Sequence, residues 1–181
     1  MMSAVAPAIV RRGLRSELED IQAVIRSANA PFATVAPADF FASYLASAVD
    51  VLGRMDAGTV LVAERAGRII GSVTVFADAN DEGMPVRLPP GTAGLRATAV
   101  HPDAQGHGVG HALVEACVLQ ARDDGARTLA LHTAPFMRSA IALYERSGFR
   151  RVPAFDYPAT AFFPGEPRND LIAIGYVLDL G

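Results

Sequence analysis

Apolar residues recur three or four positions apart in four segments of the chain, which is the spacing of one face of an α-helix. The pairs Leu113/Cys117 and Val114/Val118 are examples. The helices predicted in this way cover residues 17–28, 37–52, about 111–124 and 139–146. Runs rich in apolar and β-branched residues between them are typical of strands. The predicted strands cover residues 9–11, 59–63, 68–76, 95–100, 128–132, 150–152 and 171–178.

The order of these elements is that of a mixed α/β fold. The strands on either side of Arg65-Ala66-Gly67 are close enough in sequence to form a hairpin. Later strands alternate with helices, as in sheets that carry helices on their faces. We therefore expect an α/β (α+β) protein with a central mixed β-sheet of about six to seven strands, flanked by about four helices. No shift in composition divides the chain, so residues 1–181 are expected to form a single domain.

Local signals mark several helix ends. Ser16, with Glu19 three residues later, has the pattern of a capping box. Pro37 suits the first turn of the second helix, and Gly53 is expected to follow its end. Gly125 can end the third helix in the left-handed conformation.

Composition restricts the classes of partner. Hydrophobic residues make up 51% of the chain and charged residues 19%, a globular composition. The net charge is −3 with Lys and Arg scattered, so we expect no nucleic-acid partner. No apolar run approaches the roughly 20 residues that cross a bilayer, so we expect no membrane insertion. The single cysteine, Cys117, and a start, Met1–Arg12, unlike a secretory signal together predict a cytoplasmic protein.

The most informative segment joins a predicted strand to a predicted helix. Gln105-Gly106-His107-Gly108-Val109-Gly110-His111 follows the strand end Ala99-Val100-His101-Pro102. Free N–H groups at a helix start bind anions, and glycines let the backbone approach a phosphate. The spacing is neither that of a Walker loop nor that of the Gly-x-Gly-x-x-Gly dinucleotide turn. Phosphate binding and a purely structural turn are both open at this point.

Two motifs in order resemble the GNAT acetyltransferase superfamily. Gln105-x-x-Gly108-x-Gly110 looks like its acyl-CoA-binding signature, and the segment from Ala140 to Phe149 looks like its second feature, one strand further on. The resemblance is strong from about Thr59 to Val152. It implies an acetyl-CoA-dependent N-acyltransferase, which transfers an acetyl or other small acyl group directly to a primary amine of a small molecule or peptide.

The resemblance also implies how acetyl-CoA, the co-substrate, is held. Backbone groups of Ala99 and Val100 are expected to pair with the pantetheine arm, and the amides of the glycine-rich turn to hold the diphosphate. The implied cofactor-binding residues are Thr98, Ala99, Val100, Gln105, Gly106, His107, Gly108, Val109, Gly110, His111 and Ser139. The family often has Asn where this chain has Met137, and many members have Arg or Lys where it has His107 and His111.

Acylation of an amine by a thioester needs a proton acceptor for the amine, a donor for the oxyanion and an acid for the leaving thiolate. Tyr144 matches the family tyrosine proposed as the acid, and the backbone N–H of Val100 matches the oxyanion donor. His132, at a strand end, is a candidate base. Packing of Tyr144 between helix and sheet, and simple hydrogen bonding of His132, are the structural alternatives.

The sequence contains only weak signals for the identity of the acceptor amine. Aromatic residues of the early helices and of the late segment suggest an apolar pocket, or equally core packing or a homodimer contact: Phe32, Phe40, Phe41, Tyr44, Phe155, Tyr157, Phe162 and Phe163. The charged side chains of Asp78, Asp81 and Glu82 either attract a cationic amine or are simply solvated. His107 and His111 are four residues apart, but the Glu of a zinc protease motif is absent, so no metal is expected.

Two other functions fit the same fold. One is a non-catalytic acyl-CoA-binding sensor, and the other is an interaction module whose glycine-rich turn is structural. Binding of CoA separates the module from the other two, and release of CoA thiol with an amine separates the enzyme from the sensor.

Overall fold

The structure is a computed structural model that describes residues 7–166, 168 and 170–181. The expectation that the start of the chain is unlike a secretory signal rests partly on residues 1–6, which lie outside the described residues. The described strands form one mixed sheet of eight strands in the order β1-β2-β3-β4-β5-β8-β6, with β7 paired to β8. Strands β4 and β5 are parallel, and the other neighbours are antiparallel. The strands are β1 (Ile9–Arg12), β2 (Thr59–Arg65), β3 (Arg68–Phe76), β4 (Thr92–Val100), β5 (Thr128–Thr133), β6 (Arg150–Arg151), β7 (Tyr157–Pro158) and β8 (Ile172–Asp179).

The described chain has five α-helices where about four were expected. They are α1 (Leu18–Asn29), α2 (Ala38–Ala48), α3 (Val51–Ala57), α4 (Val109–Asp123) and α5 (Arg138–Arg146). The predicted helix over 37–52 is two helices, because the side chain of Asp50 accepts a hydrogen bond from the N–H of Gly53 at 3.1 Å and starts α3. Gly53 therefore lies inside a helix, and the expectation that it follows a helix end is wrong.

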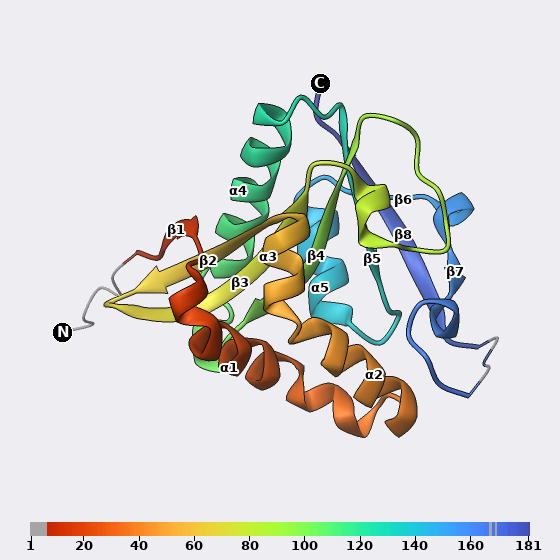
Figure 1. Cartoon of the computed structure of the whole chain (residues 1–181), viewed down its shortest axis with the longest axis horizontal. Helices are drawn as coiled ribbons and strands as arrows, with labels where there is room; N and C mark the ends of the chain where they lie inside the picture. Colours follow the sequence, from red (N-terminus) through yellow and green to blue (C-terminus); the bar gives the residue numbers. More distant parts are fainter. Residues whose placement is uncertain (1–6, 167, 169) are drawn as a thin grey trace.

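The alternation of side chains along β2 shows how both faces of the sheet are covered. Leu61 and Ala63 belong to the core that α4 and α5 share, whereas Val60 and Val62 pack with α1 and α3. Successive side chains of a strand point to opposite faces, so the two helix layers lie on opposite sides. Figure 1 shows α1 and α3 on the near side of the sheet and α4 on the far side.

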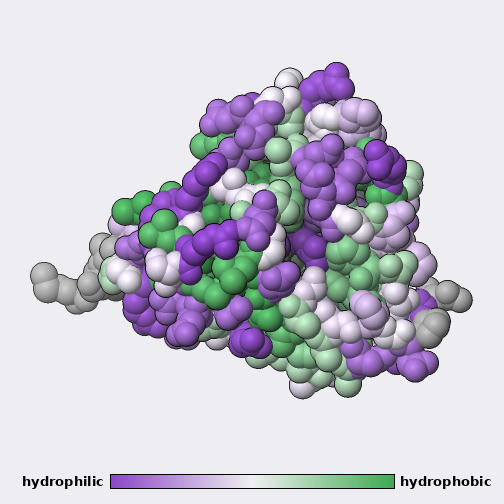
Figure 2. Space-filling model, in the orientation of Figure 1, coloured by the Kyte–Doolittle hydropathy of each residue, from purple (hydrophilic) through white to green (hydrophobic). Residues whose placement is uncertain are grey.

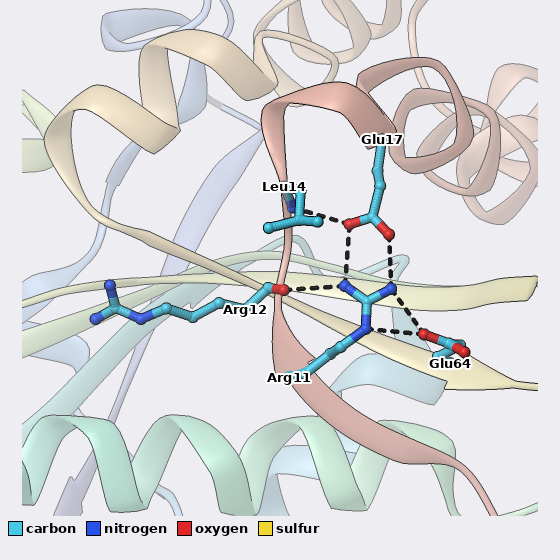
Figure 3. Close-up of polar contacts among 5 residues, drawn as sticks. All are labelled: Arg11, Arg12, Leu14, Glu17 and Glu64. Carbon is cyan, nitrogen blue, oxygen red and sulfur yellow. Dashed lines mark hydrogen bonds and ion pairs between the residues drawn. The ribbon is translucent and has the colours of Figure 1, made fainter. Parts of the chain in front are cut away.

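An ion-pair network joins β1 to the start of α1 and to β2 (Figure 3). The guanidinium of Arg11 lies 2.6 Å from the carboxylate of Glu17 and 2.7 Å from that of Glu64. Glu17 also accepts a hydrogen bond from the N–H of Leu14 at 2.8 Å. Glu17 thus receives the backbone bond that was expected at Glu19, and α1 begins without a side-chain cap, so the predicted capping box is wrong.

The surface of the near side is mixed. Figure 2 shows hydrophilic residues around smaller hydrophobic areas on this face. Among the described residues, no helix is both long enough and apolar enough to cross a membrane.

Gly125 follows α4 with a φ of 80°, which confirms the left-handed helix end predicted there.

Candidate functional site

The two parallel strands at the centre of the sheet diverge before they end. β4 and β5 are paired from Thr92/Thr128 to Leu95/Leu131. Past this point β4 continues along β3, and β5 continues along β8. The facing edges of β4 and β5 therefore enclose a gap in the sheet, in which backbone groups are available to a ligand.

A β-bulge turns the end of β4. On β3 one residue, Val73, stands opposite two residues of β4, Ala97 and Thr98. Ala97 has a φ of 56°, in the left-handed region that is uncommon for residues with a Cβ. The extra residue reverses the alternation of the strand. Leu95, before the bulge, packs on the α4 side, whereas Ala99, beyond it, packs on the α1 side.

Hydrogen bonding to β3 leaves one backbone N–H of β4 facing the gap. His101 donates its backbone N–H to β3 at 2.8 Å, next to the pair Gly71/Val100. Hydrogen-bonded and non-hydrogen-bonded pairs alternate in an antiparallel ladder. Gly71/Val100 is therefore a non-hydrogen-bonded pair, and the N–H of Val100 points away from β3. The next pair, Ser72/Ala99, is hydrogen-bonded, so the backbone groups of Ala99 are already used and cannot pair with a ligand as expected.

A cavity of about 730 Å³ occupies the gap. It is bordered by the ends of β4 and β5, the start of α4, one side of α5, and parts of α1, α2 and the late segment. The site residues expected from the sequence that line it are Thr98, Ala99, Val100, Gln105, Gly106, Gly108, Val109, Gly110, His111, His132, Ser139 and Tyr144. His107 lines a separate pocket with Pro7, Ala8 and Arg65, and its Nδ1 lies 2.8 Å from the carbonyl oxygen of Gln105.

The glycine-rich turn presents unpaired backbone N–H groups. The N–H of Gln105 donates to Pro102 and that of Ala112 donates to Gly108. Between them, the N–H groups of residues 106–111 have no acceptor in the described part of the chain. Consecutive free N–H groups at the start of a long helix are groups that bind anions in proteins, because the helix dipole adds to their partial charges.

The glycines of the turn have different structural roles. Gly106 and Gly108 have φ values of 76° and 78°, and a Cβ on either would meet nothing within 4 Å. Their backbone conformation therefore requires glycine, and the space beside them is open. A Cβ on Gly110 would lie 3.0 Å from Leu143 of α5, so this glycine allows α4 and α5 to approach each other.

Tyr144 connects α5 to β4 at the bulge. Its hydroxyl donates a hydrogen bond to Oγ1 of Thr98 at 3.1 Å. The side chain is 5% exposed and its ring packs edge-to-face on Phe149. Burial raises the pKa of Tyr144 above the usual value for a phenol, so its hydroxyl keeps its proton at neutral pH. A neutral proton donor and the free N–H of Val100 thus border the same cavity.

These features match a known family. A sequence model described as the acetyltransferase (GNAT) family matches residues 21–149. The chain belongs to the GNAT acetyltransferase family. A mycothiol acetyltransferase of Cellulomonas flavigena is 37% identical over 97 residues, which are 53% of this chain. The match spans 28% of that relative's own length.

Solved structures share the GNAT fold over nearly the whole chain. A putative acetyltransferase of the GNAT family from Desulfovibrio desulfuricans has a TM-score of 0.69 at 23% identity, covering 97% of this chain and 100% of its own. A PaiA N-acetyltransferase from Thermoplasma acidophilum, solved in complex with coenzyme A, has a TM-score of 0.70 at 12% identity. That alignment covers 94% of this chain and 98% of the other. The expected mixed α/β fold is confirmed.

His132, the candidate base, and Met137, which stands where the family often has Asn, offer no free polar group to the cavity. Nε2 of His132 lies 2.8 Å from the carbonyl oxygen of Phe155, which can only accept, so Nε2 carries the proton. Nδ1 is enclosed and has no partner in the described chain. Neither ring nitrogen is open to the cavity, and burial lowers the pKa of His132. The sulfur of Met137 accepts a hydrogen bond from Thr133 at 3.6 Å and offers no polar group of the kind that Asn would.

Glu82, Arg96 and Tyr157 are among the further polar residues that line the cavity of this GNAT protein. Sequence reasoning weighed Glu82 only as one of several loop acids and gave Arg96 no role. A carboxyl and a guanidinium that border one chamber can recognise polar groups of a ligand. Among residues 7–166, 168 and 170–181, no three His, Cys, Asp or Glu side chains gather in a way that could hold a metal ion.

Proposed function

We propose that this protein transfers an acetyl or other small acyl group from acyl-CoA to a primary amine by direct attack. The observation that carries the proposal is the common cavity. It borders residues 106 and 108–111, whose N–H groups are unpaired in the described chain, together with the free N–H of Val100 and the hydroxyl of Tyr144. An anion site, an oxyanion donor and a proton donor are the groups that acyl transfer from a CoA thioester requires.

The chain's own groups have distinct roles in this proposal. The amides of the glycine-rich turn hold the CoA diphosphate, and His111 and Ser139 also line the cavity. The edge of β4 at Thr98 and Val100 accepts the pantetheine arm, since Ala99 is bonded to β3. His107 faces a separate pocket and has no part in this arrangement. The Thermoplasma neighbour was solved with coenzyme A, which supports a CoA ligand for this fold.

The chemical step uses two of these groups. The N–H of Val100 stabilises the negative charge that develops on the thioester oxygen when the amine attacks. As the carbon–sulfur bond breaks, the hydroxyl of Tyr144 gives its proton to the leaving thiolate, and the attacking nitrogen releases one proton as it becomes the amide. Holding the amine against the thioester supplies a further part of the rate, because the reaction no longer depends on a chance encounter.

A screen of primary amines with acetyl-CoA tests the proposal. Release of CoA thiol and a mass increase of one acetyl group on the amine are expected for at least one acceptor. Stabilisation by acetyl-CoA without thiol release for any amine would instead identify a binding protein without activity. Absence of both results would leave the glycine-rich turn as a structural element and contradict the proposal.

A further inference from the structure

Arg96 borders one end of the cavity, and its guanidinium has no paired carboxylate among the described residues. Nη2 of Arg96 donates to Oγ of Ser47 at 2.6 Å, and its guanidinium lies 4.6 Å from the ring centroid of Phe162 and 5.7 Å from that of Phe163. No Asp or Glu of the described residues lies within 4 Å of this guanidinium, and its other N–H groups make no hydrogen bond to them. The rings fix the guanidinium plane and leave its donors for a ligand.

A second arginine increases the positive charge beside Ser47. Arg54 is 6% exposed and donates to Oγ1 of Thr74 and to the carbonyl oxygen of Ser47, both at 2.9 Å. Burial and the neighbouring charge of Arg96 lower the pKa of Arg54 to about 10. Two guanidinium groups thus flank Ser47 without a paired carboxylate in the described chain. An anionic ligand would offset the unfavourable burial of these charges.

Glu82 is the carboxyl group that faces this end of the cavity. It reaches the cavity because residue 94 of β4 is glycine, and a Cβ on Gly94 would collide with Oε1 of Glu82. Burial raises the pKa of Glu82 to about 8, and the charge of Arg96 opposes this rise. At neutral pH most of the carboxyl is protonated, so it does not neutralise Arg96. Its charge also acts on Tyr157, which places that phenol nearby.

The walls around these groups are apolar. Phe40, Tyr44, Phe162 and Phe163 line the cavity, and their rings contact one another at centroid distances between 4.7 and 6.1 Å. In such surroundings each polar group of a ligand needs a partner. A guanidinium fork matches a planar carboxylate, and a carboxyl group can accept the proton of an amine.

We propose that the acceptor is an amino acid or a close analogue, with its carboxylate bound by Arg96 and its amino group beside Glu82. This inference rests on the proposed function. The attacking nitrogen forms the bond to the acyl carbon and gives its proton to the carboxylate form of Glu82. The carbon–sulfur bond breaks, and the thiolate takes the proton of Tyr144. An apolar side chain of the acceptor lies against the aromatic walls.

Comparison of the twenty protein amino acids with their primary amides, each with acetyl-CoA, tests the inference on the wild-type protein. The amide has the more readily deprotonated amine, so chemistry alone favours it. We expect at least one apolar or aromatic amino acid to have a kcat/KM about 10- to 100-fold above that of its amide, from the lost charge-assisted hydrogen bonds. Arg96→Gln should bring this ratio close to one, mainly through KM, while the exposed Arg68→Gln leaves it unchanged.

The outcomes separate the two proposals. Thiol release that is faster with amides or simple amines, or with an amine phosphate ester such as phosphoethanolamine, than with any amino acid would overturn the inference and leave the acyltransferase intact. No thiol release with any amine would overturn both. Arg96→Lys keeps the charge and should retain part of the preference for the amino acid over its amide. Retention of the full preference in Arg96→Gln would also overturn the assignment of Arg96.

Discussion

The hydroxyl of Tyr144 donates a hydrogen bond to Oγ1 of Thr98 at 3.1 Å, which links α5 to β4. The bond holds the phenol beside the bulge of β4, two residues before Val100, and both Tyr144 and Val100 line the cavity. The proposed proton donor and the proposed oxyanion donor thus depend on one segment of β4. This relationship is the reason to treat Tyr144 as more than a packing residue.

Tyr144→Phe keeps the ring and its contact with Phe149 and removes only the hydroxyl. If the hydroxyl protonates the thiolate, turnover should fall by about 10²-fold or more, with acetyl-CoA affinity nearly unchanged. Tyr176→Phe is a matched control, because the hydroxyl of Tyr176 donates to Glu145 and does not border the cavity. Equal turnover in Tyr144→Phe and wild type, with an acceptor for which chemistry limits the rate, would assign Tyr144 to packing.

Acetyl-CoA should stabilise the protein by about 2.7 kcal/mol at a hundred times its dissociation constant. Gly108→Val should abolish this gain, because φ is 78° and a branched side chain would enter the space where the diphosphate is expected. Gly67→Val places the same strain at a φ of 74° in the β2–β3 hairpin, with nothing within 4 Å. Thermal unfolding with and without acetyl-CoA compares the two. If Gly108→Val keeps the shift, the phosphates bind elsewhere.

The parts of the site that the sequence predicts are those fixed by local structure. The glycine-rich turn and the helix that contains Tyr144 carry signals within ten residues, and the structure has both where they were expected. Tyr144 and the residues of the turn, apart from His107, border one cavity. Their roles are still predictions, since geometry shows position and not activity.

The acceptor end could not be predicted in this way. Ala97 adopts a positive φ that nothing in its sequence context signals, and this bulge reverses which side chains of β4 face each helix layer. The position of Arg96 depends on Ser47 and Phe162, which are far from it in sequence. Glu82 reaches the cavity through the absence of a side chain at Gly94. Each of these features depends on the tertiary structure, which periodicity and local motifs do not predict.

The network around Arg11 predicts a pH-dependent contribution to stability. A hydrogen bond from Arg11 lowers the pKa of Glu17 below its usual value. The contribution is fully present above the unfolded pKa of about 4.5 and is lost as pH falls through the folded pKa. Glu17→Gln should reduce the free energy of unfolding at pH 7 by about 1 kcal/mol. The difference from wild type should shrink as pH falls through the lowered pKa of Glu17, because the protonated carboxyl group no longer attracts Arg11.

Glu19→Gln is the control for this experiment, because Glu19 is exposed and makes no ion pair in the described chain. Denaturant unfolding at several pH values and at low and high salt measures both variants. Screening by salt should shrink the effect of Glu17→Gln and leave Glu19→Gln unchanged. An effect of Glu17→Gln that is the same at every pH would mean that Glu17 acts through its bond to Leu14 and not through its charge.

The raised pKa of Glu82 predicts the pH profile of acyl transfer. A group that takes the proton of the amine must be deprotonated, so kcat/KM should rise as pH increases through about 8. Burial raises the pKa of Glu82 and the charge of Arg96 on β4 opposes this rise, while Tyr157 of β7 is the titratable group on which Glu82 acts. Glu82→Gln should lower kcat/KM by roughly 10²-fold.

Two comparisons separate Glu82 from the acceptor amine, which also loses a proton as pH rises. An acceptor whose amine is already neutral at pH 7 should still show the rise in the wild type and should lose it in Glu82→Gln. Gly94→Ala keeps the carboxyl group but displaces it from β4, because the added Cβ would collide with Oε1. The displaced group regains water, so the rise should move to lower pH as desolvation weakens. A wild-type profile that follows only the pKa of the amine would show that Glu82 takes no proton in the reaction.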